Sequence, residues 1–66
     1  MKVFINGQPH DWERPISLEE LLERLCLRHR GLAVEVNEQI VPKTRHAQVL
    51  LADGDRLEIV SLVGGG

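Results

Sequence analysis

The chain begins with an apolar run and a turn that together predict a β-hairpin. Val3-Phe4-Ile5 is β-branched and aromatic, and the next residues, Asn6-Gly7, tolerate the positive φ angles of a tight type I′ turn. A returning strand is expected over Gln8 to Glu13. Because Pro9 has no amide hydrogen to donate to a ladder, this strand is predicted to lie at an edge of its sheet.

The hydrophobic pattern changes to a helical period at Ser17. Ser17 and Glu20 have the S-x-x-E spacing of a capping box, and Ile16 and Leu21 stand where a hydrophobic staple would form. We therefore expect one amphipathic helix to start at Ser17.

The predicted helix has one apolar face and a basic end. The apolar face consists of Leu18, Leu21, Leu22, Leu25 and Cys26. The basic residues 28–30 suit the negative end of the helix dipole, and Gly31 is expected to end the helix in a left-handed conformation. On the apolar face, Cys26 would be buried and its thiol inert.

Further strand and turn signals follow the helix. In chain order they are a strand at Ala33–Val36, a turn at Asn37-Glu38, a short strand at Ile40-Val41, an irregular connection at 42–51 with one short helical turn, a turn at Asp53-Gly54-Asp55 and a last strand at Arg56–Leu62. The predicted fold class is α+β, a four- to five-stranded sheet with one main helix packed on one face.

Alternation along the strands assigns their side chains to the two faces of this sheet. The residues expected to face the helix are Val3, Ile5, Val34, Val36, Leu57 and Ile59. The residues expected on the open face are Phe4, Glu58, Val60 and Leu62.

Composition excludes several classes of function. A chain of 66 residues forms one small domain, which makes a deep, enclosed active site improbable. Eight basic against ten acidic residues give a net charge of -2, which predicts binding to neither nucleic acid nor an anionic membrane. No apolar run approaches the roughly 20 residues that cross a bilayer. With a single cysteine and no internal disulfide, we expect a cytoplasmic protein.

Candidate chemical groups within the domain are sparse. The three histidines, His10, His29 and His46, are widely separated, so no metal site is predicted. The Asp53-Gly54-Asp55 aspartates lack the other ligands of a calcium loop and are interpreted as turn residues. The basic residues Lys43, Arg45 and His46 are interpreted as solvated charge. No catalytic grouping is present, so the protein is expected to be a carrier for other enzymes and not an enzyme.

Several segments, taken in order, resemble a known family. They are the VFING hairpin, VNEQIVPKT after the helix, LADGDRLEIV, and an end in Gly65-Gly66. On these segments the whole chain resembles the ubiquitin-like β-grasp sulfur carriers, most closely the ThiS-type carriers of thiamine biosynthesis. The resemblance implies a mixed sheet with residues 2–5 and 56–62 parallel at its centre. It also implies a β-grasp domain at 1–62 and a flexible tail at 63–66.

The resemblance also implies a chemistry at Gly66. Its terminal carboxylate would be adenylated with ATP by a ubiquitin-activating-type enzyme, and a cysteine-derived sulfur would then convert it to a thiocarboxylate. That sulfur would pass to a thiazole synthase. Gly64 and Gly65 would form a flexible segment that can enter a narrow channel, because neither residue has a side chain. No bound cofactor is expected, because the activating enzyme uses the ATP.

The partners of such a carrier would recognise its folded surface. Phe4, Val60 and Leu62 are predicted to form one apolar docking patch on the open face, with Val63 on the exit path of the tail. We expect the free protein to be a monomer.

Other functions remain open. The small subunit of molybdopterin synthase also ends in Gly-Gly, although its approach to the diglycine tends to contain proline, whereas Ser61-Leu62-Val63 stands here. A carrier for another sulfur pathway, such as amino-acid synthesis or tRNA thiolation, is a second alternative. A β-grasp interaction module whose tail is never activated is the third.

Overall fold

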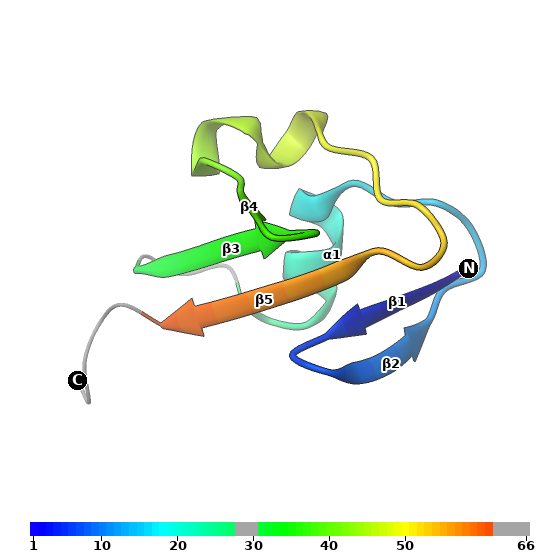
Figure 1. Cartoon of the computed structure of the whole chain (residues 1–66). Coiled ribbons are helices and arrows are strands. Elements are labelled where there is room, and N and C mark those ends of the chain that lie inside the picture. The colour runs from blue at the N-terminus through cyan, green and yellow to red at the C-terminus, as the bar shows by residue number, and fades with distance from the viewer. Residues whose placement is uncertain (28–30, 62–66) are drawn as a thin grey trace.

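Five strands form one mixed sheet in the part of the chain that the computed structural model describes, residues 1–27 and 31–61. They are β1 (Lys2–Ile5), β2 (Gln8–Asp11), β3 (Leu32–Val36), β4 (Gln39–Ile40) and β5 (Arg56–Ser61). Their spatial order is β2-β1-β5-β3-β4, with β1 and β5 parallel at the centre and the other neighbours antiparallel (Figure 1). The predicted mixed sheet and its parallel central pair are confirmed.

Both hairpins close through turns in which two consecutive residues have positive φ angles. These angles are 50° and 85° at Asn6-Gly7, and 51° and 70° at Asn37-Glu38. Two left-handed residues match the twist of the strands they join, which confirms the type I′ turn predicted at Asn6-Gly7.

Strand β2 lies at an edge of the sheet, as Pro9 predicted. Ile5 and Gln8 flank the two-residue turn and form a hydrogen-bonded pair, so the next pair, Phe4 and Pro9, is a non-hydrogen-bonded one. The backbone nitrogen of Pro9 therefore points away from β1, and its lack of a hydrogen removes no bond from the ladder with β1.

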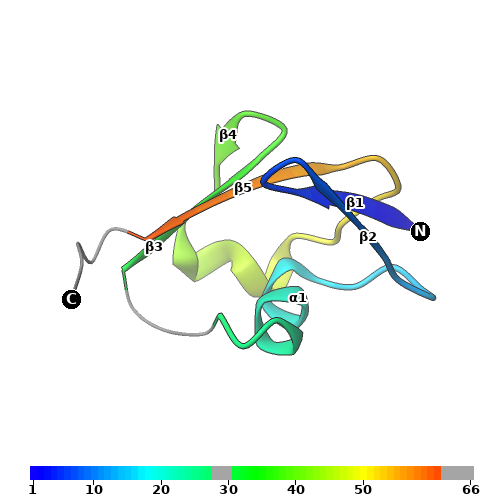
Figure 2. The same cartoon turned by 90° about the horizontal axis from the view of Figure 1, so that it is seen from below.

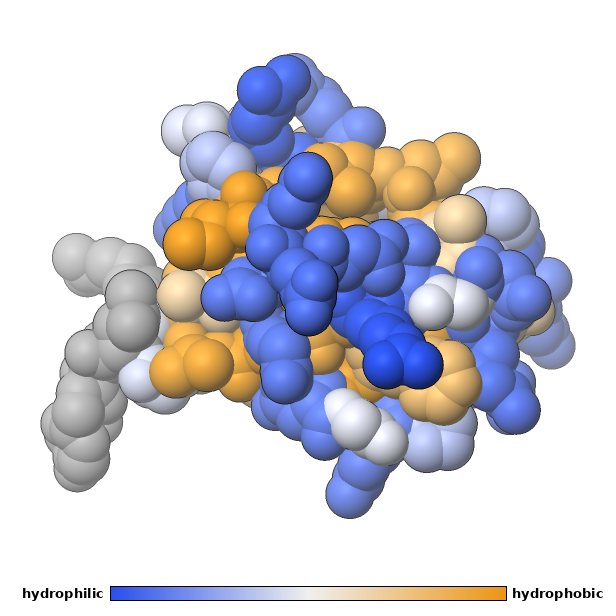
Figure 3. All heavy atoms as spheres, viewed as in Figure 1, coloured by the Kyte–Doolittle hydropathy of each residue, from blue (hydrophilic) through white to orange (hydrophobic). Residues whose placement is uncertain are grey.

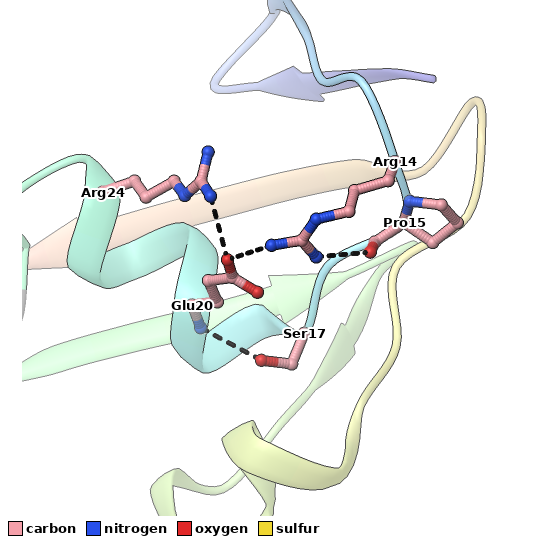
Figure 4. A network of polar contacts seen from close by, with 5 residues as sticks. All are labelled: Arg14, Pro15, Ser17, Glu20 and Arg24. Atoms are coloured by element: carbon pink, nitrogen blue, oxygen red, sulfur yellow. Dashed lines mark hydrogen bonds and ion pairs between the residues drawn. The ribbon is translucent and has the colours of Figure 1, made fainter.

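Within the described ranges, two helical segments lie on one side of the sheet and none lies on the other (Figure 2). They are α1 (Leu18–Arg24) and the 3₁₀ helix η1 (Lys43–Gln48). At the start of α1, the Ser17 hydroxyl accepts a hydrogen bond from the Glu20 amide at 3.1 Å, which confirms the predicted N-cap. The Glu20 carboxylate pairs with Arg14 at 2.9 Å and with Arg24 at 3.1 Å (Figure 4).

Helix α1 ends at Arg24, earlier than the sequence predicted. Cys26 has a φ of 58°, and its amide donates to the Glu23 carbonyl at 3.0 Å. The Leu27 amide donates to the Leu22 carbonyl at 2.8 Å. These two bonds form a Schellman motif, in which a left-handed residue after the last helical turn caps the free carbonyls.

The early end of α1 corrects two predictions. Cys26 is exposed and not buried, because helical spacing no longer applies beyond Arg24. Gly31 has the predicted left-handed conformation, with φ of 83°, but it does not end the helix. The basic residues 28–30 lie outside the described residues.

The core lies between the sheet and the helical layer. Its buried residues are Val3, Ile5, Ile16, Leu18, Leu21, Leu22, Val34, Leu51 and Leu57. Val36 and Ile59 are partly buried against them, which confirms the residues predicted to face the helix.

His46 differs from its prediction as part of a solvated basic stretch. Only 8% of its surface is exposed, because η1 directs the ring inward. Its Nε2 donates to the Val41 carbonyl at 3.1 Å, which satisfies the buried donor.

Candidate functional site

The residues predicted to carry the chemistry follow the central strand. Strand β5 ends at Ser61. The predicted tail and exit-path residues lie outside the described part of the chain, and their roles stay predictions; they are Leu62, Val63, Gly64, Gly65 and Gly66.

The turn before β5 is anchored by its two aspartates. The Asp53 carboxylate accepts a hydrogen bond from the Lys2 amide at 2.7 Å, and the Asp55 carboxylate accepts one from the Ala52 amide at 2.8 Å. Asn37 donates to the other Asp55 oxygen at 3.0 Å. These carboxylates therefore act as the turn residues that the sequence predicted. Among the described residues, no group of three His, Cys, Asp or Glu side chains could hold a metal ion.

The open face of the sheet does not join Phe4 and Val60 into one apolar patch. Phe4 lies beside Arg56, whose guanidinium carbon is 5.9 Å from the centre of the phenyl ring. Val60 stands four residues further along β5, about 13 Å away at the usual rise of a strand. Glu58 lies between them on the same face. Figure 3 shows this face with hydrophilic residues over its middle and hydrophobic ones beside the end of β5.

The middle of the open face is acidic. Glu58 stands directly opposite Glu35 of β3, and Glu35 in turn stands opposite Ile40 of β4. Two exposed apolar side chains flank this acidic pair. Ile40, beside Glu35, is 72% exposed, and Val60, two residues after Glu58, is 55% exposed. The exposed position of Ile40 is not predictable from the sequence pattern, because the face of a two-residue strand follows only from its register with β3.

A shallow hollow crosses the open face at the start of β5. Its lining is formed by Phe4, Gly7, Glu38, Arg56, Leu57 and Glu58. Carboxylates and a guanidinium group that are open to solvent suit polar contacts with a partner surface.

None of the helices in the described ranges is long and apolar enough to cross a membrane.

Comparison with known proteins agrees with this architecture. The family model described as the ThiS family matches residues 3–66. The sulfur carrier protein ThiS of Escherichia coli K12 is 35% identical over 66 residues, which is 100% of each chain. A crystal structure of the thiamine biosynthesis protein ThiS from Geobacter metallireducens superimposes with a TM-score of 0.86 at 26% identity and covers 100% of both chains.

One relative is a much longer protein. A thiazole synthase from Paramagnetospirillum magneticum is 47% identical over 66 residues, which is 100% of this chain but 20% of that protein. The chain thus spans one fifth of that relative. Because the family model and the full-length carriers cover the sheet, the helix and the glycine segment alike, the chain belongs to the ThiS family.

Proposed function

We propose that this protein is a sulfur carrier of thiamine biosynthesis whose Gly66 carboxylate becomes a thiocarboxylate. The observation that carries the proposal is the family match over residues 3–66, which includes the three terminal glycines together with the folded domain. The full-length similarity to a sulfur carrier protein of Escherichia coli supports it.

The chemistry follows from the poor reactivity of a carboxylate. An α-carboxyl group has a pKa of roughly 3.3 to 3.7 and is therefore ionised at neutral pH. Attack of this carboxylate on the α-phosphate of ATP forms an acyl-adenylate and releases pyrophosphate. A hydrosulfide equivalent derived from cysteine then attacks the glycine carbonyl carbon, forms the C–S bond and displaces AMP, which leaves a thiocarboxylate. Glycine suits this position because it has no Cβ to obstruct a narrow channel.

The partners in this proposal are a ubiquitin-activating-type adenylating enzyme, a cysteine-derived sulfur donor system and a thiazole synthase. The thiazole synthase relative, one fifth of which matches this chain, supports a link between the carrier domain and that class of enzyme. The protein supplies the carried group and its partners supply the catalysis. We assign this exchange to the cytoplasm, where thiols stay reduced.

Intact-mass spectrometry tests the chemical step. Wild-type protein co-expressed with its own adenylating enzyme is expected to gain the mass of one sulfur in exchange for one oxygen. Gly66→Ala and a variant lacking Gly66 are expected to remain unmodified while keeping the wild-type circular dichroism spectrum. A shortened variant that still gains sulfur would refute the assignment to Gly66.

The competing functions separate in two further measurements. A residue added after Gly66 is tolerated by an interaction module but abolishes the activity of a carrier. Rescue of a thiazole-requiring strain identifies the thiamine pathway, whereas a carrier for molybdopterin or another sulfur pathway does not support growth there.

The open face near the end of β5 supplies the proposed docking surface, with the exposed Val60 as its apolar contact. Val60→Asp is expected to weaken binding to the adenylating enzyme without unfolding the domain, because it replaces an exposed apolar contact by a charge. Leu50→Asp is a matched control, since Leu50 is 68% exposed but belongs to no strand of the sheet. Equal affinities of the two variants would argue against this surface.

A further inference from the structure

The last part of β5 extends beyond its parallel partner. Backbone bonds join the strands from the Phe4 amide to the Asp55 carbonyl and from the Asn6 amide to the Leu57 carbonyl, each at 2.9 Å. Strand β1 ends at Ile5, whereas β5 continues to Ser61. On this side of β5, the backbone groups of Ile59 come next in the ladder, at the point where β1 has already turned away.

The side chain of Asn6 fills the place of the missing strand. Its Oδ1 accepts a hydrogen bond from the Ile59 amide at 2.8 Å, and its Nδ2 donates one to the Ile59 carbonyl at 3.2 Å. A carboxamide carries the same donor and acceptor as a peptide group, so Asn6 continues the ladder by one step. Strand β5 therefore has partners on both sides at this point, because Ile59 bonds Asn6 while the backbone groups of its neighbours alternate towards β3.

Asn6 combines this contact with a second task in the hairpin turn. Its φ of 50° is a left-handed value that asparagine tolerates better than most residues. Glycine would satisfy the turn equally well, but it could not hold Ile59. The identity of the residue is therefore explained by the contact with β5 and not by the turn alone.

We infer that Asn6 is a positioning residue for the carrier reaction, holding the end of β5 so that the chain leaves the domain towards Gly66 from a fixed point. The inference rests on the function proposed above. Without the contact, residues near Ile59 gain conformations that the activating enzyme must remove when it binds the tail. Ordering one backbone residue corresponds to a factor of about 5 to 30 in an equilibrium constant.

Asn6→Gly separates the contact from the turn, and Asn37→Gly is its matched control. Asn37 has a φ of 51° and accepts a hydrogen bond from the Arg56 amide at 3.0 Å, but this contact is at the start of β5 and not at its end. Both variants are expected to stay folded. In ATP–pyrophosphate exchange with the adenylating enzyme, Asn6→Gly should raise the KM for the carrier about 5- to 30-fold at unchanged kcat. Asn37→Gly should leave the KM unchanged.

Amide hydrogen exchange of the isolated proteins tests the contact itself. The Ile59 amide is expected to exchange faster in Asn6→Gly than in wild type, and to be only partly affected in Asn6→Asp, which keeps the acceptor but loses the donor. An unchanged KM in Asn6→Gly, or an equal rise in Asn37→Gly, would overturn the inference while leaving the carrier function intact. Failure of the wild-type protein to support exchange would overturn the proposed function, and the inference with it.

Discussion

Replacing Cys26 by glycine is expected to stabilise the domain. Cys26 has a φ of 58° at the Schellman position after α1, and a left-handed backbone costs an L-residue about 1–2 kcal/mol. Glycine avoids this cost but loses about 0.5–1 kcal/mol of extra backbone entropy on folding. The Cys26 side chain is exposed, so its removal sacrifices little packing. The difference lies between about 0 and 1.5 kcal/mol, and its midpoint predicts a gain of about 0.75 kcal/mol in the free energy of unfolding.

Urea and thermal denaturation, followed by circular dichroism under reducing conditions, measure this gain. For a domain of this size, a gain of about 0.75 kcal/mol corresponds to a rise in Tm of about 3–6 °C. Cys26→Ala is the matched control, because it removes the thiol but keeps the Cβ that makes the left-handed backbone unfavourable. If Cys26→Gly is no more stable than Cys26→Ala, the backbone at residue 26 is not the source of strain and the reasoning fails.

Three other substitutions test the core and the surface charges. Leu21 is fully buried, so Leu21→Ala should cost about 2–5 kcal/mol in urea denaturation, and a loss well under 1 kcal/mol would contradict its place in the core. Glu58→Gln should gain about 0.2–1 kcal/mol at low salt by relieving repulsion from Glu35, and a loss there would refute the repulsion. The hydrogen bond from Arg14, with the nearby charge of Arg24, lowers the pKa of Glu20 from its ordinary value of 4.5. The unfolded state therefore binds this proton first, so stability falls as the pH drops through 4.5 and below. Glu20→Gln should remove this part of the pH dependence of stability in acid titrations. If the stability of the variant depends on pH as in the wild type, Glu20 is not its source.

Local patterns in the sequence predicted most of the fold. The type I′ turn at Asn6-Gly7 and the N-cap at Ser17 each depend on residues within a few positions of one another. The alternation of β5 likewise assigned Leu57 to the core and Glu58 to the open face. Such features can be predicted from the sequence because backbone preference and side-chain period act over short distances.

The end of α1 could not be predicted in the same way. Gly31 is the strongest stop signal in this region, yet the chain turns at Cys26, a residue with no preference for a left-handed backbone. Leu27 is partly buried against the core after that turn. The position of Leu27 depends on packing against the core, which local signals in the sequence do not reveal.

The sequence by itself determined the order of the elements, the faces of the longer strands and the likeness of the glycine segment to a carrier tail. Only the tertiary structure decided how separate strands align. The register of β1, β3 and β5 sets Glu58 between Phe4 and Val60, and it brings Asn6 to Ile59 across 53 positions of sequence. The physical reason is that register arises from the simultaneous packing of side chains across the whole sheet, which no single segment encodes.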